Sequence, residues 1–359
     1  MRTYLALTFL LIDAALVSAA ELREVASFPD KQVTGVGVSK TSGRIFVNFP
    51  YWSDDHSISV AEIVNGQAKA FPNDEWNKPG PAGSHFVCVQ SVVVDDQDNL
   101  WVLDPAAPKM QEIVKDGPKL VKIDLGTNQV VQTIPFGEDV APKKSYLNDV
   151  RIDTRRNTAF ITESANGAIV VVDLKSGKAR RLLDGHPSTE PEKDVKLVVD
   201  RKALIDQQTK TPPQIASDGI ALDVKNGYLY YHALTGHTLY RIKTSFLIDE
   251  KIPEKELESK IENVGRTPAP DGMLEGTDGS VYLTDLEASG VVRWYPESKR
   301  VEQIISDKRL LWPDTLSWGP NGEIYVTASQ IENMPRFNSG RSTRTEPYKL
   351  WKITGIKAE

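Results

Sequence analysis

The 359-residue chain contains a single cysteine, Cys88. One thiol can form no internal disulfide, so the fold must be held together by packing and hydrogen bonds. Cys88 lies in the apolar run FVCVQSVVV, which favours a buried small hydrophobe over a catalytic nucleophile. After residue 20 the chain also lacks any Asn-x-Ser/Thr acceptor for N-linked glycans.

Basic residues are in deficit as well. The chain has 43 Lys and Arg against 49 Asp and Glu, a net charge of −6. Proteins that bind nucleic acids concentrate positive charge to displace counterions, and no segment here does so. The sequence has no Gly-x-Ser-x-Gly elbow, phosphate loop, His-Glu-x-x-His or Cys-x-x-Cys motif. We therefore expect no nucleic-acid partner and none of the activities that those motifs serve.

Long apolar runs are confined to the first 20 residues, MRTYLALTFLLIDAALVSAA. Arg2, the apolar stretch and the small residues at its end are typical of a cleavable secretory signal, although Asp13 interrupts it. The sequence predicts a signal peptide over 1–20, one domain over 21–359 and no membrane span after cleavage. A secreted or periplasmic protein, of bacterial type because it has neither disulfides nor glycans, is the expected localisation.

What the sequence does contain is an internal repeat. Each copy has a short strand, a tight turn and a second strand rich in β-branched and aromatic residues. Turns such as Asn226-Gly227 and Asp278-Gly279 are strong hairpin formers, because these residues accept positive φ at little cost. Six segments align: 33–49, 89–104, 147–164, 216–234, 269–286 and 312–329.

A third strand follows most copies, as in AIVVVDL (168–174), and a more variable fourth strand follows that. The second and third strands are apolar on both faces, so both faces must be covered by neighbouring sheets. Stacking of such sheets around an axis predicts an all-β, six-bladed β-propeller with four-stranded blades. The last copy supplies three strands, so ELREVASF (21–28) is expected to close the ring as its fourth. Two charged insertions, 194–208 and 253–265, are predicted to form short surface helices.

Four carboxylates occupy the aligned position at the start of the inner strand: Asp149, Asp218, Asp271 and Asp314. The first two copies carry Gly35 and Ser91 there instead. Inner strands of a propeller begin near its axis, so these carboxylates should converge. They cannot all stay ionised cheaply in a desolvated channel: either their pKa values rise or a hard cation sits among them. An architectural role is the alternative, because aspartate is common in turns.

Further polar residues should reach the same face. Asn148 and Gln90 directly precede two aligned positions, His232 ends a second strand, and Trp52 lies in a loop near His56. We assign Gln90, Asn148, His232 and Trp52 as candidate ligand-binding residues. His232 has an equally simple interpretation as an ordinary hydrogen-bonded histidine, since the histidines show no metal-ligand spacing.

Several strings resemble the yellow/major royal jelly protein family. These include FPYWSDDHSISVAEI, LNDVRID, SDGIALD and LLWPDTL, and the similarity runs over most of the chain after residue 20. The resemblance implies a secreted six-bladed propeller with a small polar or aromatic ligand in its central cavity. Relatives of this kind are tied to pigmentation and small-amine binding, and some to dopachrome conversion.

A more distant resemblance is to the gluconolactonase/senescence-marker propellers, which share the string PDGM (270–273). It implies the alternative function, a sugar-lactone hydrolase or isomerase that uses a divalent cation, with calcium favoured. Asp218 and Asp271 would hold the metal, and Asp149 or Asp314 would accept the proton. The glutamate that completes this family's metal site has no counterpart around Gly35. Neither the identity of the small-molecule partner nor the oligomeric state follows from the sequence.

Overall fold

The computed structural model describes residues 20–52 and 57–356. Nearly all of the predicted signal peptide, and His56 in the loop after Trp52, lie outside the described residues. Within the described ranges, no helix is long and apolar enough to cross a membrane.

Six antiparallel four-stranded sheets make up the fold. Their strands are, blade by blade: β2 (Val36–Val38), β3 (Ile45–Asn48), β4 (Val60–Val64) and β5 (Gln67–Ala70); β6 (Ser91–Val94), β7 (Asn99–Asp104), β8 (Lys119–Asp124) and β9 (Gln129–Pro135); β10 (Leu147–Asp153), β11 (Thr158–Glu163), β12 (Ala168–Asp173) and β13 (Ala179–Leu182); β16 (Ser217–Asp223), β17 (Tyr228–Ala233), β18 (Thr238–Lys243) and β19 (Glu262–Arg266); β20 (Met273–Glu275), β21 (Val281–Asp285), β22 (Gly290–Trp294) and β23 (Val301–Ser306); β24 (Pro313–Trp318), β25 (Ile324–Ala328), β26 (Tyr348–Thr354) and β1 (Glu21–Phe28).

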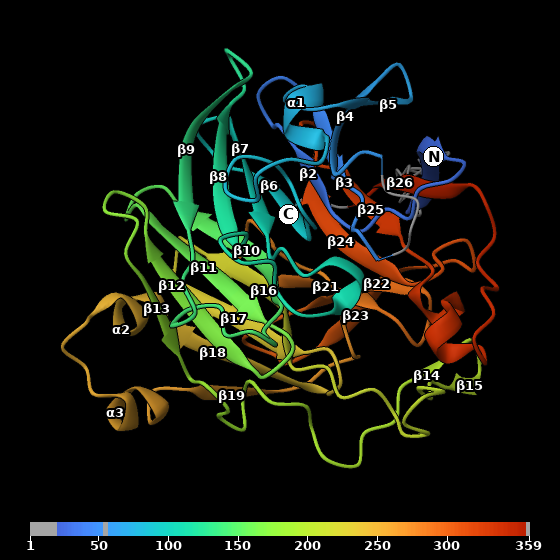
Figure 1. The fold of residues 1–359 in the computed structure, drawn as a ribbon. Coiled ribbons are helices and arrows are strands. Elements are labelled where there is room, and N and C mark those ends of the chain that lie inside the picture. Colours follow the sequence, from blue (N-terminus) through green and yellow to red (C-terminus); the bar gives the residue numbers. More distant parts are fainter. Residues whose placement is uncertain (1–19, 53–56, 357–359) are drawn as a thin grey trace, which may run out of the picture.

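The sheets are arranged as the blades of a propeller. In Figure 1, β6, β10, β16 and β24 surround the middle of the molecule, whereas β5, β9, β13 and β19 lie at its periphery. The predicted turns form as expected, with positive φ at Gly227 (70°), Gly279 (85°) and Gly322 (79°). The predicted six-bladed, all-β fold is therefore confirmed.

The hydrophobic core lies between the blades. One cluster, for example, joins Trp101 and Leu120 of the second blade to Val150, Ile161 and Val170 of the third. Strand β11 is buried along its whole length because neighbouring blades cover both of its faces. This arrangement explains why the second and third strands are apolar on both sides.

The ring closes through its N-terminal strand. Strand β1 pairs antiparallel with β26, in a register that runs from Glu21 opposite Thr354 to Phe28 opposite Tyr348. Phe28 is buried and meets the ring of Phe49 edge-on, with ring centroids 5.1 Å apart, so the closing strand also contacts the first blade. The predicted closure is confirmed.

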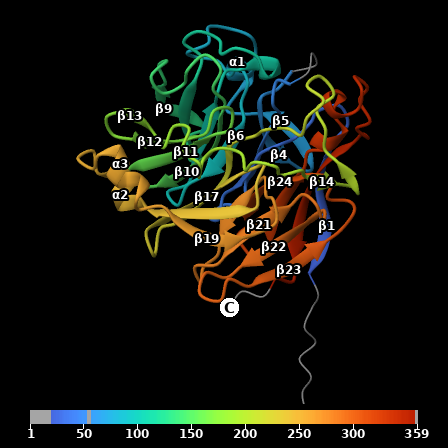
Figure 2. The ribbon, with the colours of Figure 1, turned by 90° about the horizontal axis from the view of Figure 1, so that it is seen from below.

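One of the two insertions differs from prediction. Residues 194–208 form no helix but a two-stranded ribbon, β14 (Val198–Val199) and β15 (Lys202–Ala203), because Asp200 and Arg201 both adopt positive φ and make a turn. The insertion 253–265 contains the predicted short helix, α3 (Glu254–Glu258), and its last four residues belong to β19. Figure 2 shows α3 and α2 (Thr244–Ile248) on the outside of the propeller. The other short helices are α1 (Asp74–Asn77) and the 3₁₀ turns Pro108–Met110, Ile331–Asn333 and Pro335–Phe337.

Replacing Phe28 tests the closure. Phe28→Ala should lower the free energy of unfolding by about 3–5 kcal/mol, the usual cost of removing a buried aromatic ring. Arg23→Ala in the same strand, an exposed position, should change it by less than about 0.5 kcal/mol. Equilibrium denaturation with urea measures both, and equal small effects would show that β1 does not stabilise the ring.

Candidate functional site

Three of the four inner strands that carry an aligned carboxylate have a β-bulge beside it. Pairing registers shift between Leu147 and Val150 in β10, and between Pro313 and Leu316 in β24. Strand β16 shifts in the same way around Asp218. A bulge re-aims the side chains of the residues it contains. Asp149, Asp218 and Asp314 all lie inside these irregular segments, near the start of their inner strands.

Two glycines after the carboxylates are required by close packing of neighbouring inner strands. A Cβ atom at Gly272 would lie 2.0 Å from the backbone oxygen of Asp314. One at Gly219 would lie 2.7 Å from the backbone oxygen of Asp271. Both distances are too short for any residue with a Cβ atom. In each Asp-Gly pair, an aspartate of the site is therefore followed by a glycine that close packing requires.

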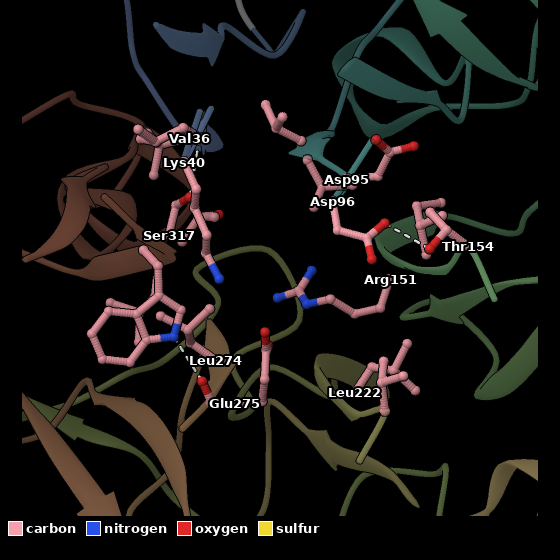
Figure 3. Close-up of a pocket in the computed structure, with 18 of the residues that line it drawn as sticks. Val36, Lys40, Asp95, Asp96, Arg151, Thr154, Leu222, Leu274, Glu275 and Ser317 are labelled. Atoms are coloured by element: carbon pink, nitrogen blue, oxygen red, sulfur yellow. Dashed lines mark hydrogen bonds between the residues drawn. The ribbon is translucent and has the colours of Figure 1, made fainter. Parts of the chain in front are cut away.

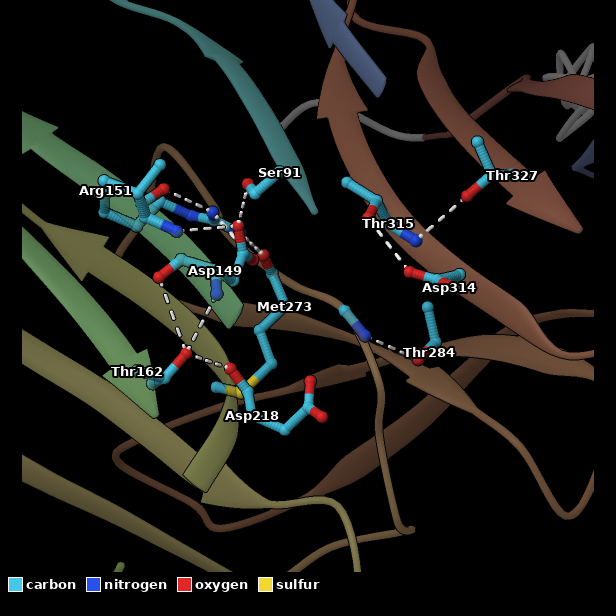
Figure 4. A network of polar contacts seen from close by, with 12 residues as sticks. Ser91, Asp149, Arg151, Thr162, Asp218, Met273, Thr284, Asp314, Thr315 and Thr327 are labelled. Carbon is cyan, nitrogen blue, oxygen red and sulfur yellow. Dashed lines mark hydrogen bonds and ion pairs between the residues drawn. The ribbon is translucent and has the colours of Figure 1, made fainter. Parts of the chain in front are cut away.

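Threonines of the second strands hold the bulged segments in place. The Thr162 hydroxyl donates to the backbone oxygen of Asp218 (2.6 Å) and accepts from the backbone N–H of Asp149 (3.2 Å). Thr284 accepts from the backbone N–H of Asp271 in the same way (2.9 Å). Figure 4 shows Thr162 between its two neighbouring strands. The threonine hydroxyls therefore fix the backbone of the aspartates that carry the carboxylates.

A cavity of about 280 Å³ opens above these inner-strand starts. It combines carboxylates and amides at its floor with aromatic and apolar side chains from the loops. Its lining includes Trp52, Gln90, Lys144, Tyr146, Asn148, Asp218, Asp271, Trp312, Asp314, Arg336 and Phe337. We call this the upper cavity. The structure thus brings together six of the eight predicted site residues: Trp52, Gln90, Asn148, Asp218, Asp271 and Asp314.

Three carboxylates share the floor of the upper cavity. Burial raises the pKa of Asp271 to about 6, although the Trp312 indole donates to its Oδ2 at 2.6 Å. Burial, together with the charges of the neighbouring aspartates, raises the pKa of Asp218 well above its usual range. Asp314 behaves in the same way, with burial as the main cause. Asp218 and Asp271 hydrogen-bond to each other, so the two carboxyl groups share a proton when no cation is near.

Asp149 differs from the other three. It does not line the upper cavity; its carboxylate accepts from the Ser91 hydroxyl at 2.6 Å and forms an ion pair with Arg151 at 2.9 Å. The guanidinium supplies the opposite charge that the other carboxylates lack. The pairing follows from the β-bulge around Asp149, which the sequence pattern did not reveal.

Tyr146 is a cavity residue that sequence reasoning did not identify. Its hydroxyl donates to Gln90 Oε1 at 2.8 Å and accepts from the Trp52 indole at 2.8 Å. Burial raises the pKa of Tyr146 well above its usual range, so the phenol stays protonated. Gln90 and Trp52 are therefore held in one orientation by a residue that precedes the third inner strand.

His232 lies away from the upper cavity. It is fully buried, with Nδ1 2.6 Å from the backbone oxygen of Ala233 and Nε2 3.1 Å from the Thr267 hydroxyl. Burial lowers the pKa of His232 to about 4, so the ring is neutral at physiological pH. Its contacts match the structural interpretation, and it does not line the cavity as a ligand-binding residue would.

The floor fits a metal ion incompletely. In the part of the chain that the structure describes, no three His, Cys, Asp or Glu side chains are grouped so that they could hold a metal. Asp218 and Asp271 are hydrogen-bonded to each other, and Arg151 engages Asp149. A calcium ion requires about six to eight oxygen ligands, more than Asp218 and Asp271 offer.

Fold and cavity together define a six-bladed β-propeller with an acidic, aromatic-rimmed pocket at one mouth of its axis. The sequence model of the major royal jelly protein family matches residues 87–345. The chain belongs to that family.

Individual relatives are distant. Major royal jelly protein 6 of Apis mellifera is 23% identical over 205 residues, which cover 55% of this chain and 45% of that protein. The yellow-related salivary protein M10 of Phlebotomus duboscqi is 25% identical over 168 residues, covering 42% and 41% of the two chains. The aligned region thus spans less than half the length of either relative.

Solved structures share the fold at lower identity. A gluconolactonase from Xanthomonas campestris has a TM-score of 0.56 at 11% identity, with 95% of this chain and 91% of that chain covered. Regucalcin from Agrobacterium tumefaciens, described as a calcium-binding protein, has a TM-score of 0.52 at 12% identity, with 93% and 96% covered. A streptogramin B lyase has a TM-score of 0.53 at 15% identity, with 93% and 97% covered.

The buried carboxylates predict a pH-dependent stability. Asp271 keeps its proton up to about pH 6 in the folded chain, but only below about pH 4 in the unfolded chain. Its contribution to the free energy of unfolding is therefore complete in acid and is lost as pH rises through 6. One pKa unit corresponds to about 1.4 kcal/mol, so the contribution lost is roughly 2–3 kcal/mol. Asp218 and Asp314 act in the same direction.

Asp271→Asn should flatten this dependence, because asparagine keeps an acceptor for Trp312 without a charge. Urea denaturation at several values between pH 4 and pH 7 measures the slope. Asp139→Asn, at an exposed position, is the control and should leave it unchanged. An equal slope in Asp271→Asn and the parent protein would contradict the assigned burial effect.

Proposed function

We propose that this protein binds a small protonated arylalkylamine in the upper cavity. The observation that carries the proposal is the group of three aspartates, Asp218, Asp271 and Asp314, at the floor of a cavity with aromatic walls. The cationic side chains at the cavity do not neutralise this group. Arg336 is paired with Asp206 at 2.5 Å, and Lys144 is exposed.

An ammonium group fits this floor electrostatically. Each of the three carboxylates has a pKa raised mainly by burial, so its ionisation costs more free energy here than in water. A cation among them favours the ionised form, and the bound amine and the carboxylates stabilise each other. Hydrogen bonds from an ammonium to carboxylates are stronger than those between neutral groups.

The walls suit an aromatic ring. Trp52, Tyr146, Trp312 and Phe337 contribute to the lining, and the first three have fixed hydrogen-bond partners. Rings held in one orientation lose little conformational freedom when a ligand stacks on them. The volume of about 280 Å³ is in the range of a small-molecule site.

A metal-dependent lactonase is the second candidate. The three convergent carboxylates and the gluconolactonase and regucalcin neighbours support it. Asp218 and Asp271 would hold the cation, which would polarise a lactone carbonyl, and Asp314 would accept a proton. The hydrogen bond between Asp218 and Asp271, and the small number of oxygen ligands that they offer, favour the amine.

We also propose that the chain is exported after removal of residues 1–20.

Binding of 2-phenylethylamine, measured by isothermal titration calorimetry, tests the proposal. The uncharged match 2-phenylethanol should bind at least about tenfold more weakly, a loss of about 1.4 kcal/mol. Asp271→Asn and Asp218→Asn should weaken amine binding by a similar factor or more, whereas Asp139→Asn should not. Affinity should rise as pH increases through 6, where Asp271 ionises.

Equal binding of amine and alcohol, or no binding of either, would overturn the proposal. A lactone panel with added calcium, repeated with chelator, examines the second candidate in parallel. Calcium-dependent hydrolysis that is lost in Asp271→Asn would favour the lactonase over the amine binder.

A further inference from the structure

The opposite mouth of the channel holds a second cavity, of about 330 Å³. It is lined by the far ends of all six inner strands, including Val38, Val94, Arg151, Leu222, Glu275 and Trp318. It shares no lining residue with the upper cavity. We call it the lower cavity, and Figure 3 shows it from close by.

Arg151 is the central polar group of the lower cavity. It is only 7% exposed; Nη1 donates to the backbone oxygen of Val150 at 2.7 Å and pairs with Asp149, and Nη2 donates to the backbone oxygen of Met273 at 2.7 Å. Its Nε–H has no hydrogen-bond partner among the described residues. A buried donor left unpaired is energetically costly, so the guanidinium gains from an acceptor that can reach it.

Lys40 adds a second positive charge. Figure 3 shows Lys40 and Arg151, from opposite sides of the lower cavity, extending toward each other across its centre. Lys40 comes from the turn after β2 and is exposed, whereas Arg151 is fixed in β10. Two cations that face one open space form a receptor for a carboxylate.

Acidic groups lie beside these cations. Asp96 accepts from the Thr154 hydroxyl at 2.6 Å, which fixes its carboxylate at the wall. Glu275 is anchored through its backbone oxygen, which accepts from the Trp318 indole at 2.7 Å. Burial raises the pKa of Glu275, and the nearby charges of Arg151 and Lys40 oppose that rise. A third acidic residue, Asp95, also lines the cavity, so a purely anionic ligand would meet repulsion from three acidic side chains.

The remaining wall is apolar. Val36, Val38, Leu222, Leu274 and Leu316 line it together with Trp318. An aliphatic or aromatic side chain of a ligand would displace water from this surface, which favours binding. The lower cavity thus presents three kinds of surface to one small molecule: cationic, acidic and apolar.

We propose that the lower cavity binds a zwitterionic amino acid with an apolar side chain. Its carboxylate lies between the Arg151 guanidinium and the Lys40 ammonium. Its ammonium faces Glu275 and Asp96, and its side chain packs on the apolar wall. This site is separate from the proposed amine site, because the two cavities share no lining residue.

Isothermal titration calorimetry with L-leucine, L-valine and L-phenylalanine tests this site. Two analogues of leucine each lack one charge: 4-methylpentanoate has no ammonium, and 3-methylbutylamine has no carboxylate. At least one amino acid should bind, and each analogue should bind at least about tenfold more weakly than leucine. Lys40→Met and Glu275→Gln should each weaken binding by about tenfold, whereas the exposed Lys202→Met should not.

Arg151→Gln is measured alongside, with its unfolding midpoint, because loss of the Asp149 pair can destabilise the chain. A folded Arg151→Gln protein with unchanged leucine affinity would overturn the proposal, as would no binding of any of the three amino acids at about 10 mM. If Arg151→Gln does not fold, the Lys40 and Glu275 variants decide. Lys40→Met should keep full 2-phenylethylamine binding, so the two proposed sites fail or succeed independently.

Discussion

Close backbone contact between neighbouring inner strands is the constraint on which the rest of this structure depends. At Gly272 the next blade's backbone comes so near that a Cβ atom would lie 2.0 Å from the oxygen of Asp314. Such contact brings residues that are far apart in sequence to one axis, as in other propellers. Because an aspartate stands beside each of these contacts, the fold concentrates negative charge where water is scarce. The raised pKa values of Asp218 and Asp271 follow from that placement.

The repeat made most of the fold predictable. Hairpin turns, doubly apolar strands and the missing last strand indicated six blades and the closure by β1, and the structure has both. The ribbon at Val198–Ala203 was not predictable from charge spacing, because two consecutive positive-φ residues, Asp200 and Arg201, produce its turn. Charged residues at helical spacing do not exclude such a turn.

The site was predictable only in part. Alignment of the repeats identified Asp218, Asp271 and Asp314, since equivalent positions in a propeller meet at one mouth. The alignment could not distinguish Asp149 from these three residues. The ion pair of Asp149 with Arg151 depends on how the β-bulge orients the two side chains. His232 ends a second strand as expected, yet Ala233 and Thr267 satisfy both of its ring nitrogens.

The two mouths of the channel differ in charge for a reason visible in the strands. Inner strands begin with carboxylates at the upper cavity and end among Lys40, Arg151 and Glu275 at the lower one. Arg151 lines the lower cavity and pairs with Asp149, the one aligned aspartate of the four that does not line the upper cavity. The chain can therefore present a cation receptor and a mixed-charge receptor on opposite faces of one ring.

A carbon NMR titration of the aspartate carboxyl groups tests the central claim most directly. The account predicts that Asp271 titrates near pH 6 in the free protein, and that saturating 2-phenylethylamine moves its pKa downward. An Asp271 carboxyl that titrates near the ordinary 3.8 in the free protein, or one unaffected by the amine, would contradict it.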